Sequence, residues 1–292
     1  MTPHGDGDGW VHCAEGHRHW GLFGAAGLLL RRDDAGTAEV LLQHRATWSH
    51  HGGTWGLLGG ARHHRETVVD AALREAGEEG GLDPAYVEVH GRFDDSHGGW
   101  TYATVLAGAR RGAVAQPTGG ESIDVAWVAV EDVTSLPLHP GLAGAWPSLR
   151  GALHQPTVVV DAANVVGSRP DGWWRDRAGA ARRLVEAVAG LSRSGLERSA
   201  LPPGWDLPEL TCWWPRWVVV LEGAARPAAQ NAPQGVCVVA AEGSGDDAIV
   251  QAVHDAGGGP VLVVTADRGL RDRCHSIGAA SVGSRWLADM FA

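Results

Sequence analysis

The stretch Gly60–Leu82, GARHHRETVVDAALREAGEEGGL, combines a helical pattern with an unusual density of charge. Apolar residues at 68, 69, 72, 73 and 76 recur at helical spacing and predict a helix over 66–79. On that helix Glu75, Glu78 and Glu79 stand at i, i+3 and i+4, so their carboxylates share one face and repel one another. A hard divalent cation such as Mg²⁺ or Mn²⁺ takes carboxylate oxygens as ligands. The spacing therefore predicts a metal site on this face.

The sequence on both sides of this stretch predicts strands. Residues 24–42 read as two short strands around a polar turn, which is typical of a hairpin. Further strand-like runs lie at 86–93, 101–107 and 124–130, and prolines at 137, 140 and 147 then interrupt the pattern. We expect one α/β domain over 1–154, with a lead-in at 1–20.

The pattern of predicted strands and helices changes after the segment around residue 155. Short, fully apolar strands alternate with helical segments, beginning with TVVVDA at 157–162 and continuing with WVVVLEG at 217–223 and VLVVT at 261–265. Unbroken apolar strands between helices are typical of a parallel sheet that is covered on both faces. The second domain, 155–292, is therefore expected to be a doubly wound α/β domain.

Composition excludes several classes of protein. The 292 residues carry a formal net charge of −10, which disfavours a basic nucleic-acid binder. No apolar run reaches the ~20 residues that span a bilayer, and the start of the chain lacks the features of a signal peptide. Four scattered cysteines do not suggest a disulfide framework. We expect a cytoplasmic protein without a membrane partner.

The charged and glycine positions of the opening stretch match a known motif. These are Gly60, Glu66, Arg74, Glu75, Glu78, Glu79 and Gly81. The chain resembles the Nudix hydrolases over roughly residues 20–150. The resemblance implies an α/β/α sandwich, dependence on Mg²⁺ or Mn²⁺, and hydrolysis of a nucleoside diphosphate linked to another group. It also implies that Glu75, Glu78 and Glu79 are metal ligands, that Arg74 orients a carboxylate, and that Gly60 and Glu66 shape the entry to the helix.

The chemistry of pyrophosphate hydrolysis leads to the same residues. The reaction needs neutralisation of charge on phosphate oxygens and a deprotonated water, and a bound metal ion assists both. Glu78 or Glu79 is a candidate general base. Glu121, just before a predicted strand, is a candidate further carboxylate at the site, and Arg45 is a candidate for binding the nucleotide substrate.

The lead-in contains a second group of metal-binding residue types. His12, Cys13, His17 and His19 lie within HCAEGHRHWG. Their spacing matches no common zinc pattern, and four ligands within eight residues would crowd one ion. The role of this cluster stays open at the level of sequence.

Acidic residues in the second domain follow the predicted strands. Asp161 ends one strand, with Asn164 three residues later; Asp246 and Asp247 open a helix; Asp267 follows the strand that ends at Thr265. Doubly wound sheets place their sites at the carboxyl ends of strands, although each aspartate could also be a helix cap.

This ordered set resembles the NYN branch of PIN-like ribonucleases. The resemblance implies that Asp161, Asp247 and Asp267 hold Mg²⁺ or Mn²⁺, with Asp246, Asn164 and Thr265 in support, and that the domain cleaves single-stranded RNA. Two alternatives remain: only the first site is active and the second domain is a scaffold, or the first domain senses a nucleotide and controls the nuclease.

Overall fold

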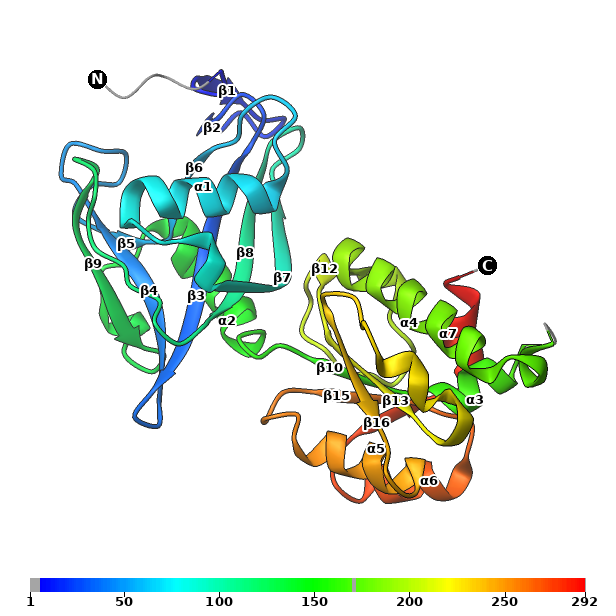
Figure 1. The fold of residues 1–292 in the computed structure, drawn as a ribbon. Helices are drawn as coiled ribbons and strands as arrows, with labels where there is room; N and C mark the ends of the chain where they lie inside the picture. Colours follow the sequence, from blue (N-terminus) through cyan, green and yellow to red (C-terminus); the bar gives the residue numbers. More distant parts are fainter. Residues whose placement is uncertain (1–5, 170–171, 292) are drawn as a thin grey trace. The chain divides into compact units, whose positions relative to one another are not determined.

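The computed structural model describes residues 6–169 and 172–291 and divides into two compact units (Figure 1). One unit is Met1–Leu153 with Pro208–Thr211, and the other is His154–Leu207 with Cys212–Ala292. The first five residues of the expected lead-in lie outside the described part. That residues 1–154 and 155–292 fold separately stays a prediction. Among the described residues, no helix has the length and apolar character needed to cross a membrane.

A mixed sheet organises the first unit. Strand β3 (Ala25–Asp34) pairs in parallel with β8 (Thr101–Ala109) and antiparallel with β4 (Thr37–Arg45) and β6 (Leu58–Ala61). β8 pairs antiparallel with β7 (Val87–Ser96), and β4 pairs with β5 (Trp55–Gly56) and β9 (Ser122–Ala129). The expected hairpin at 24–42 is thus confirmed as β3 and β4. A separate antiparallel pair, β1 (Trp10–His12) and β2 (Arg18–Trp20), forms the lead-in.

Helix α1 (Val68–Gly80) covers one face of this sheet through small residues. Ala71, Ala72 and Ala76 are buried against Leu28 and Leu58 of the strands. The Thr67 hydroxyl caps the helix by accepting the Asp70 N–H, so the helix begins two residues later than the predicted position 66. Gly81 ends it in the left-handed region, φ 62°, where glycine has no steric penalty. A second helix, α2 (Pro140–Gly151), lies behind the sheet in Figure 1.

The second unit is built on a parallel sheet. Its strands are β10 (Thr157–Asp161), β13 (Arg216–Leu221), β14 (Val236–Ala240), β15 (Val261–Val264) and β16 (Ala280–Val282). All neighbours pair in parallel, in the order β14-β13-β10-β15-β16. The predicted parallel sheet is confirmed. The order reverses direction between β10 and β15, which is where doubly wound sheets leave a crevice.

Apolar cores lie on both faces of the parallel sheet. Val158 and Val160 of β10 belong to a core with α4 (Arg177–Ser194), whereas Val159 belongs to a core with α5 (Gly245–His254) and α6 (Arg268–His275). Alternate residues of one strand therefore pack into cores on opposite faces of the sheet, which explains the unbroken apolar runs. The short helices α3 (Ala162–Gly167) and α7 (Ser284–Asp289) complete the unit, together with the short strands β11 (Leu196–Glu197) and β12 (Cys212–Trp213).

Five 3₁₀ helices connect these elements in the described residues. They are Pro84–Tyr86, Val133–Ser135, Trp173–Arg175, Arg198–Ala200 and Gly223–Ala229.

Candidate active site

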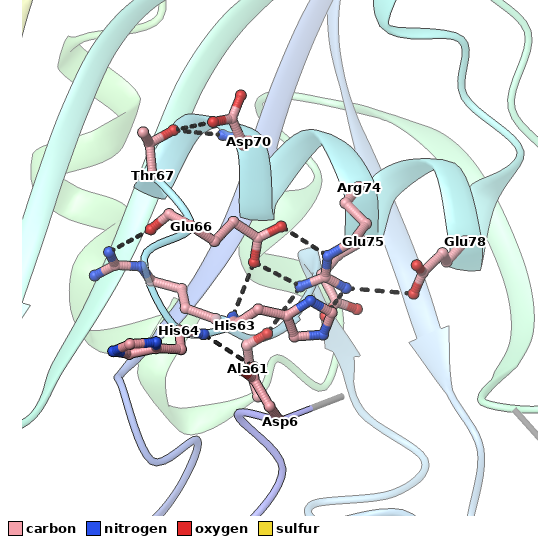
Figure 2. A network of polar contacts seen from close by, with 11 residues as sticks. Asp6, Ala61, His63, His64, Glu66, Thr67, Asp70, Arg74, Glu75 and Glu78 are labelled. Atoms are coloured by element: carbon pink, nitrogen blue, oxygen red, sulfur yellow. Dashed lines mark hydrogen bonds and ion pairs between the residues drawn. The ribbon is translucent and has the colours of Figure 1, made fainter. Parts of the chain in front are cut away.

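Arg74 is the centre of a network of carboxylates on α1 and in the loop before it (Figure 2). Its Nε donates to Glu66 at 2.8 Å, one Nη donates to Glu75 at 2.8 Å and to Glu78 at 3.4 Å, and the other donates to the Ala61 carbonyl at 2.9 Å. These hydrogen bonds, led by those with Glu66, raise the pKa of Arg74 further above its ordinary value. The guanidinium therefore fixes the orientation of the Glu66 and Glu75 carboxyl groups and makes a longer contact with Glu78.

Glu66 connects this network to the loop before the helix. One of its oxygens accepts the His63 N–H at 2.9 Å and an Arg74 N–H at 3.1 Å. Burial disfavours the charged carboxylate, but the hydrogen bonds from Arg74 and His63 together hold the pKa of Glu66 below its usual value. Glu66 thus connects the loop before the helix to Arg74 on α1, and its shaping role stays a prediction.

Two glycines bring the backbone of β6 close to the carboxylates. The Gly59 N–H donates to Glu79 at 2.8 Å. A Cβ added at Gly60 would stand 2.7 Å from the carboxyl group of Glu75, so no larger residue fits while Glu75 keeps its position. The structure brings Glu75 and Glu79 to one strand edge, while the Glu78 side chain, 57% exposed, extends into solvent beside them.

The electrostatics of this face fit a divalent cation. Burial, followed by repulsion from Glu75, raises the pKa of Glu79 to about 8. Burial also raises the pKa of Glu75, and the charges of Glu78 and Glu121 add to that rise. Carboxylates that repel one another in a partly desolvated site are stabilised by a cation, and oxygen ligands suit Mg²⁺ or Mn²⁺. The donor set therefore fits the expected metal.

Because the pKa of Glu79 is raised to about 8, we predict that it makes stability depend on pH in the metal-free chain. Between its ordinary pKa and about 8, the folded state holds a proton that the unfolded state has released. Stability should therefore fall by about a few kcal/mol as pH rises through this window. Glu79→Gln cannot ionise and should remove that part of the slope. Urea unfolding with a chelator at pH 5 and pH 8 checks this; parallel pH profiles for both proteins would contradict it.

Glu121 and Arg45, the other residues predicted for this site, make no hydrogen bond to the carboxylates of α1 among the described residues. Glu121 is exposed, its carbonyl accepts the Ala46 N–H, and its charge raises the pKa of both Glu75 and Glu79. Arg45 donates from Nε to the His50 carbonyl at 3.2 Å. Within the described part of the chain Arg45 forms no ion pair with the carboxylates of α1, and its role in binding substrate stays a prediction.

Two residues near the carboxylates were missed by sequence reasoning. Gln43 is fully buried on β4, donates to the Ser122 hydroxyl at 2.7 Å, and hydrogen-bonds Glu79. Burial, followed by the negative charge of Glu79, raises the pKa of Tyr102 on β8. A glutamine inside the apolar run VLLQ was the available signal for the first residue, since a buried amide needs polar partners.

The second unit has a cavity of about 280 Å³ at the carboxyl ends of its strands. Its acidic lining residues are Asp161, Glu222, Asp246 and Asp267. Asp161 accepts from the Asn164 N–H at 3.0 Å and from the Thr265 hydroxyl at 2.8 Å. Burial raises the pKa of Asp161, and the charges of Asp246 and Glu222 add to the rise. The structure thus brings Asp161, Asn164 and Asp267 together, as the sequence predicts, with Thr265 bonded to Asp161.

Two details of this cavity differ from the sequence prediction. Asp246 lines the cavity, whereas Asp247, which we expected to be the ligand, is 72% exposed and pairs with Arg273 at 2.6 Å. Adjacent residues at the start of a helix point about 100° apart, so only one of them faces the sheet. Glu222 was missed, although it directly follows the apolar strand β13. Its carboxylate accepts the Gly245 N–H at 3.1 Å.

The lead-in histidines occupy a separate cluster. Cys13, His17 and His19 come together there, whereas His12 is exposed on β1 and takes no part. Burial, followed by the neighbouring imidazoles of His97 and His17, lowers the pKa of His19.

Comparison with known proteins bears on the first unit. The NUDIX domain family matches residues 22–149. A Mycobacterium tuberculosis protein provisionally named 8-oxo-dGTP diphosphatase 3 is 51% identical over 158 residues, which cover 51% of this chain and 71% of that protein. A Bifidobacterium longum protein named as a nucleoside triphosphate pyrophosphatase/Nudix hydrolase fusion is 41% identical over 52% of this chain and 33% of its own length. A solved Nudix hydrolase from M. smegmatis is 46% identical, covers 49% of this chain and 93% of its own, and has a TM-score of 0.46.

Proposed function

This chain belongs to the Nudix family, and on that premise we propose that its first unit is a metal-dependent nucleotide pyrophosphohydrolase. The observation that carries the proposal is the carboxylate face of α1, where Arg74 holds Glu75 and Glu78 and the Gly59 N–H holds Glu79. We assign Glu75, Glu78 and Glu79 as the groups that would hold Mg²⁺ or Mn²⁺. The bound cation would neutralise charge on the phosphate oxygens.

The protein groups have separate tasks in this scheme. Glu79 is the candidate general base, because a bound cation would favour its ionised form, and an ionised carboxylate can accept a proton from water. Glu75 remains close to the backbone of β6 because Gly60 has no side chain. Arg74 prevents the carboxylates from moving apart under their mutual repulsion, and Glu121 contributes negative charge from the opposite loop.

The name of one relative supports a proposal for the substrate class. We propose a purine nucleoside triphosphate or an oxidised form of one, since the M. tuberculosis relative is provisionally named for 8-oxo-dGTP. A panel of 8-oxo-dGTP, dGTP, ATP and ADP-ribose with Mg²⁺, analysed for nucleotide products, tests the proposal. Turnover of none of these, by a folded chain, would count against an active Nudix site and would favour the nucleotide-sensor alternative.

We further propose that the second unit is a metal-dependent nuclease of PIN-like type, acting on single-stranded RNA. The supporting observation is the cavity in which Asp161, Glu222, Asp246 and Asp267 gather at a reversal of strand order. Clustered carboxylates would hold divalent cations that activate water and stabilise a leaving oxygen. The alternative is that the second unit is a scaffold without enzymatic activity. The cytoplasmic location also stays a prediction.

Asp161→Asn should abolish RNA cleavage if this second proposal is correct. The amide keeps an acceptor for the Asn164 N–H, and the Thr265 hydroxyl can rotate to accept from the new amide, so the fold should survive. We expect cleavage of internally labelled single-stranded RNA with Mn²⁺ to fall by about 10²-fold or more, because metal stabilisation worth several kcal/mol is lost. Asp247→Asn makes the same charge change outside the cavity and should leave cleavage intact. Absence of cleavage by the unmodified chain would support the scaffold.

A further inference from the structure

A group of cysteine and histidine side chains lies between the β1–β2 hairpin and the turn that joins β7 to β8. The Sγ atom of Cys13 and ring nitrogens of His17 and His19 all lie within 4.8 Å of one another. Glu15, His17 and His97 form a second group whose ligand atoms lie within the same 4.8 Å limit. Because His17 belongs to both groups, residues from two distant parts of the sequence converge on one place.

Backbone hydrogen bonds hold the two loops together. The Cys13 N–H donates to the His17 carbonyl at 3.0 Å, which closes the hairpin turn. Gly16 has a φ of 81° within this turn, a conformation that glycine adopts without strain. The Ala14 N–H donates to the Gly98 carbonyl at 2.8 Å and so ties the hairpin to the turn that carries His97. These hydrogen bonds therefore hold together the backbone of the two loops that carry the candidate ligands.

His19 is prepared as a ligand by its surroundings. Its ring stacks on Trp100, with centroids 4.1 Å apart and planes 12° apart, and the Trp100 indole N–H is itself fixed on the Gly21 carbonyl. The Nε2 atom of His19 is buried and has no hydrogen-bond partner among the described residues. A buried nitrogen of this kind is rare and points to an atom that the side chains alone do not supply.

Cys13 provides a thiol in the same apolar setting. It is 6% exposed, and it packs with Ala25 and Trp100. Carboxylates stand behind two of the histidines: Glu15 lies 3.5 Å from Nδ1 of His17, and Asp95 lies 3.3 Å from Nε2 of His97. Histidines that bind metals commonly donate their other ring nitrogen to such a carboxylate. This arrangement leaves Nε2 of His17 and Nδ1 of His97 for a metal ion.

We propose that Cys13, His17 and His19 bind a Zn²⁺ ion, with His97 as the fourth ligand. Thiolate and imidazole ligands favour Zn²⁺ over the hard cations that suit the carboxylates of α1. In a tetrahedral site the ligand atoms stand about 3.4–3.8 Å apart, so the atoms of Cys13, His17 and His19, which lie within 4.8 Å of one another, have to approach by up to about 1 Å. His97, whose ring centroid lies 4.8 Å from that of His19, has to turn its ring toward this group. The crowding expected from the sequence is relieved because His12 is excluded and His97 comes from another loop. The ion would join the lead-in hairpin to the main sheet.

Metal analysis of the full-length chain tests this site. The chain is desalted in excess Mg²⁺, which occupies carboxylate sites, and its zinc content is measured. We expect about one zinc per chain, and on replacement by Co²⁺ a thiolate-to-cobalt charge-transfer band. Cys13→Ser and His19→Asn should lose both signals. His12→Asn on the same hairpin and Cys237→Ser at an exposed cysteine should retain them. Because Cys13 is buried, His17→Asn at an exposed position provides a variant that leaves the core intact.

The outcomes decide the assignment independently of the nucleotide reaction. Zinc that is lost in Cys13→Ser or His17→Asn but kept in Glu79→Gln supports it. An unmodified chain that holds no zinc and gives no charge-transfer band overturns it. Equal zinc content in the unmodified chain and in both Cys13→Ser and His17→Asn also overturns it.

Discussion

Glu79→Gln is expected to lower kcat/KM for the nucleotide substrate by about 10²–10⁴-fold, the range that a positioned general base contributes. The change removes one negative charge from a side chain that is 7% exposed and that we assign to both metal binding and proton transfer. It preserves the shape of the group and an acceptor for the Gly59 N–H, so the fold should be retained. Initial rates with saturating Mg²⁺, together with far-UV circular dichroism, measure the two effects separately.

A matched control for this change lies on the same helix. Asp70 is exposed in the first turn of α1, and Asp70→Asn makes the same charge change without touching the carboxylate face. We expect its kcat/KM to stay within about a factor of two, since a surface substitution alters little. Similar rates for Glu79→Gln and Asp70→Asn would remove Glu79 from the mechanism.

Arg74→Met should be among the most destabilising single changes in the first unit. It leaves Glu66 and Glu75, whose side chains are 13% and 14% exposed, without their cation, and it removes the hydrogen bond to the Ala61 carbonyl. Breaking a largely buried ion pair by removing one partner costs about 3–5 kcal/mol. The loss of stability in Arg74→Lys should be smaller than that in Arg74→Met, because an ammonium keeps the charge but lacks the planar fork of the guanidinium. Urea unfolding of the first unit at pH 7 with a chelator measures the change.

The exposed pair Arg110–Glu88 supplies the control for Arg74. Its charged atoms are 3.7 Å apart and its side chains are 58% and 48% exposed, so Arg110→Met should cost no more than about 1 kcal/mol. If Arg74→Met unfolds at the same urea concentration as Arg110→Met, the network in Figure 2 does not stabilise the fold as we describe.

Local patterns predicted most of the elements. Helical spacing located α1, and alternation of apolar strands with helices located the parallel sheet of the second unit, because each pattern reports how one element meets its core. The predicted ends of the elements were less exact. The Thr67 cap places the start of the helix at Val68, two residues after the predicted start, and the two-residue strand β5 is too short to give a pattern. Capping and pairing depend on neighbours that the local sequence does not specify.

The sites were predictable in part for the same reason. Glu75, Glu78 and Glu79 share one helix, so their spacing alone placed them on one face. The choice of Asp246 rather than Asp247 depends on the rotation of α5 against the sheet, and the meeting of His97 with Cys13 depends on pairing between distant loops. Neither relation is encoded in local spacing.

The most direct test of the central claim is identification of the products formed from 8-oxo-dGTP or dGTP with Mg²⁺, by anion-exchange chromatography. A nucleotide pyrophosphohydrolase should release the nucleoside monophosphate and pyrophosphate, and Glu79→Gln should form them at least about 10²-fold more slowly. Release of the nucleoside diphosphate and phosphate would contradict the pyrophosphohydrolase assignment. Product formation that is unchanged in Glu79→Gln would contradict the assignment of the α1 carboxylate face as the active site.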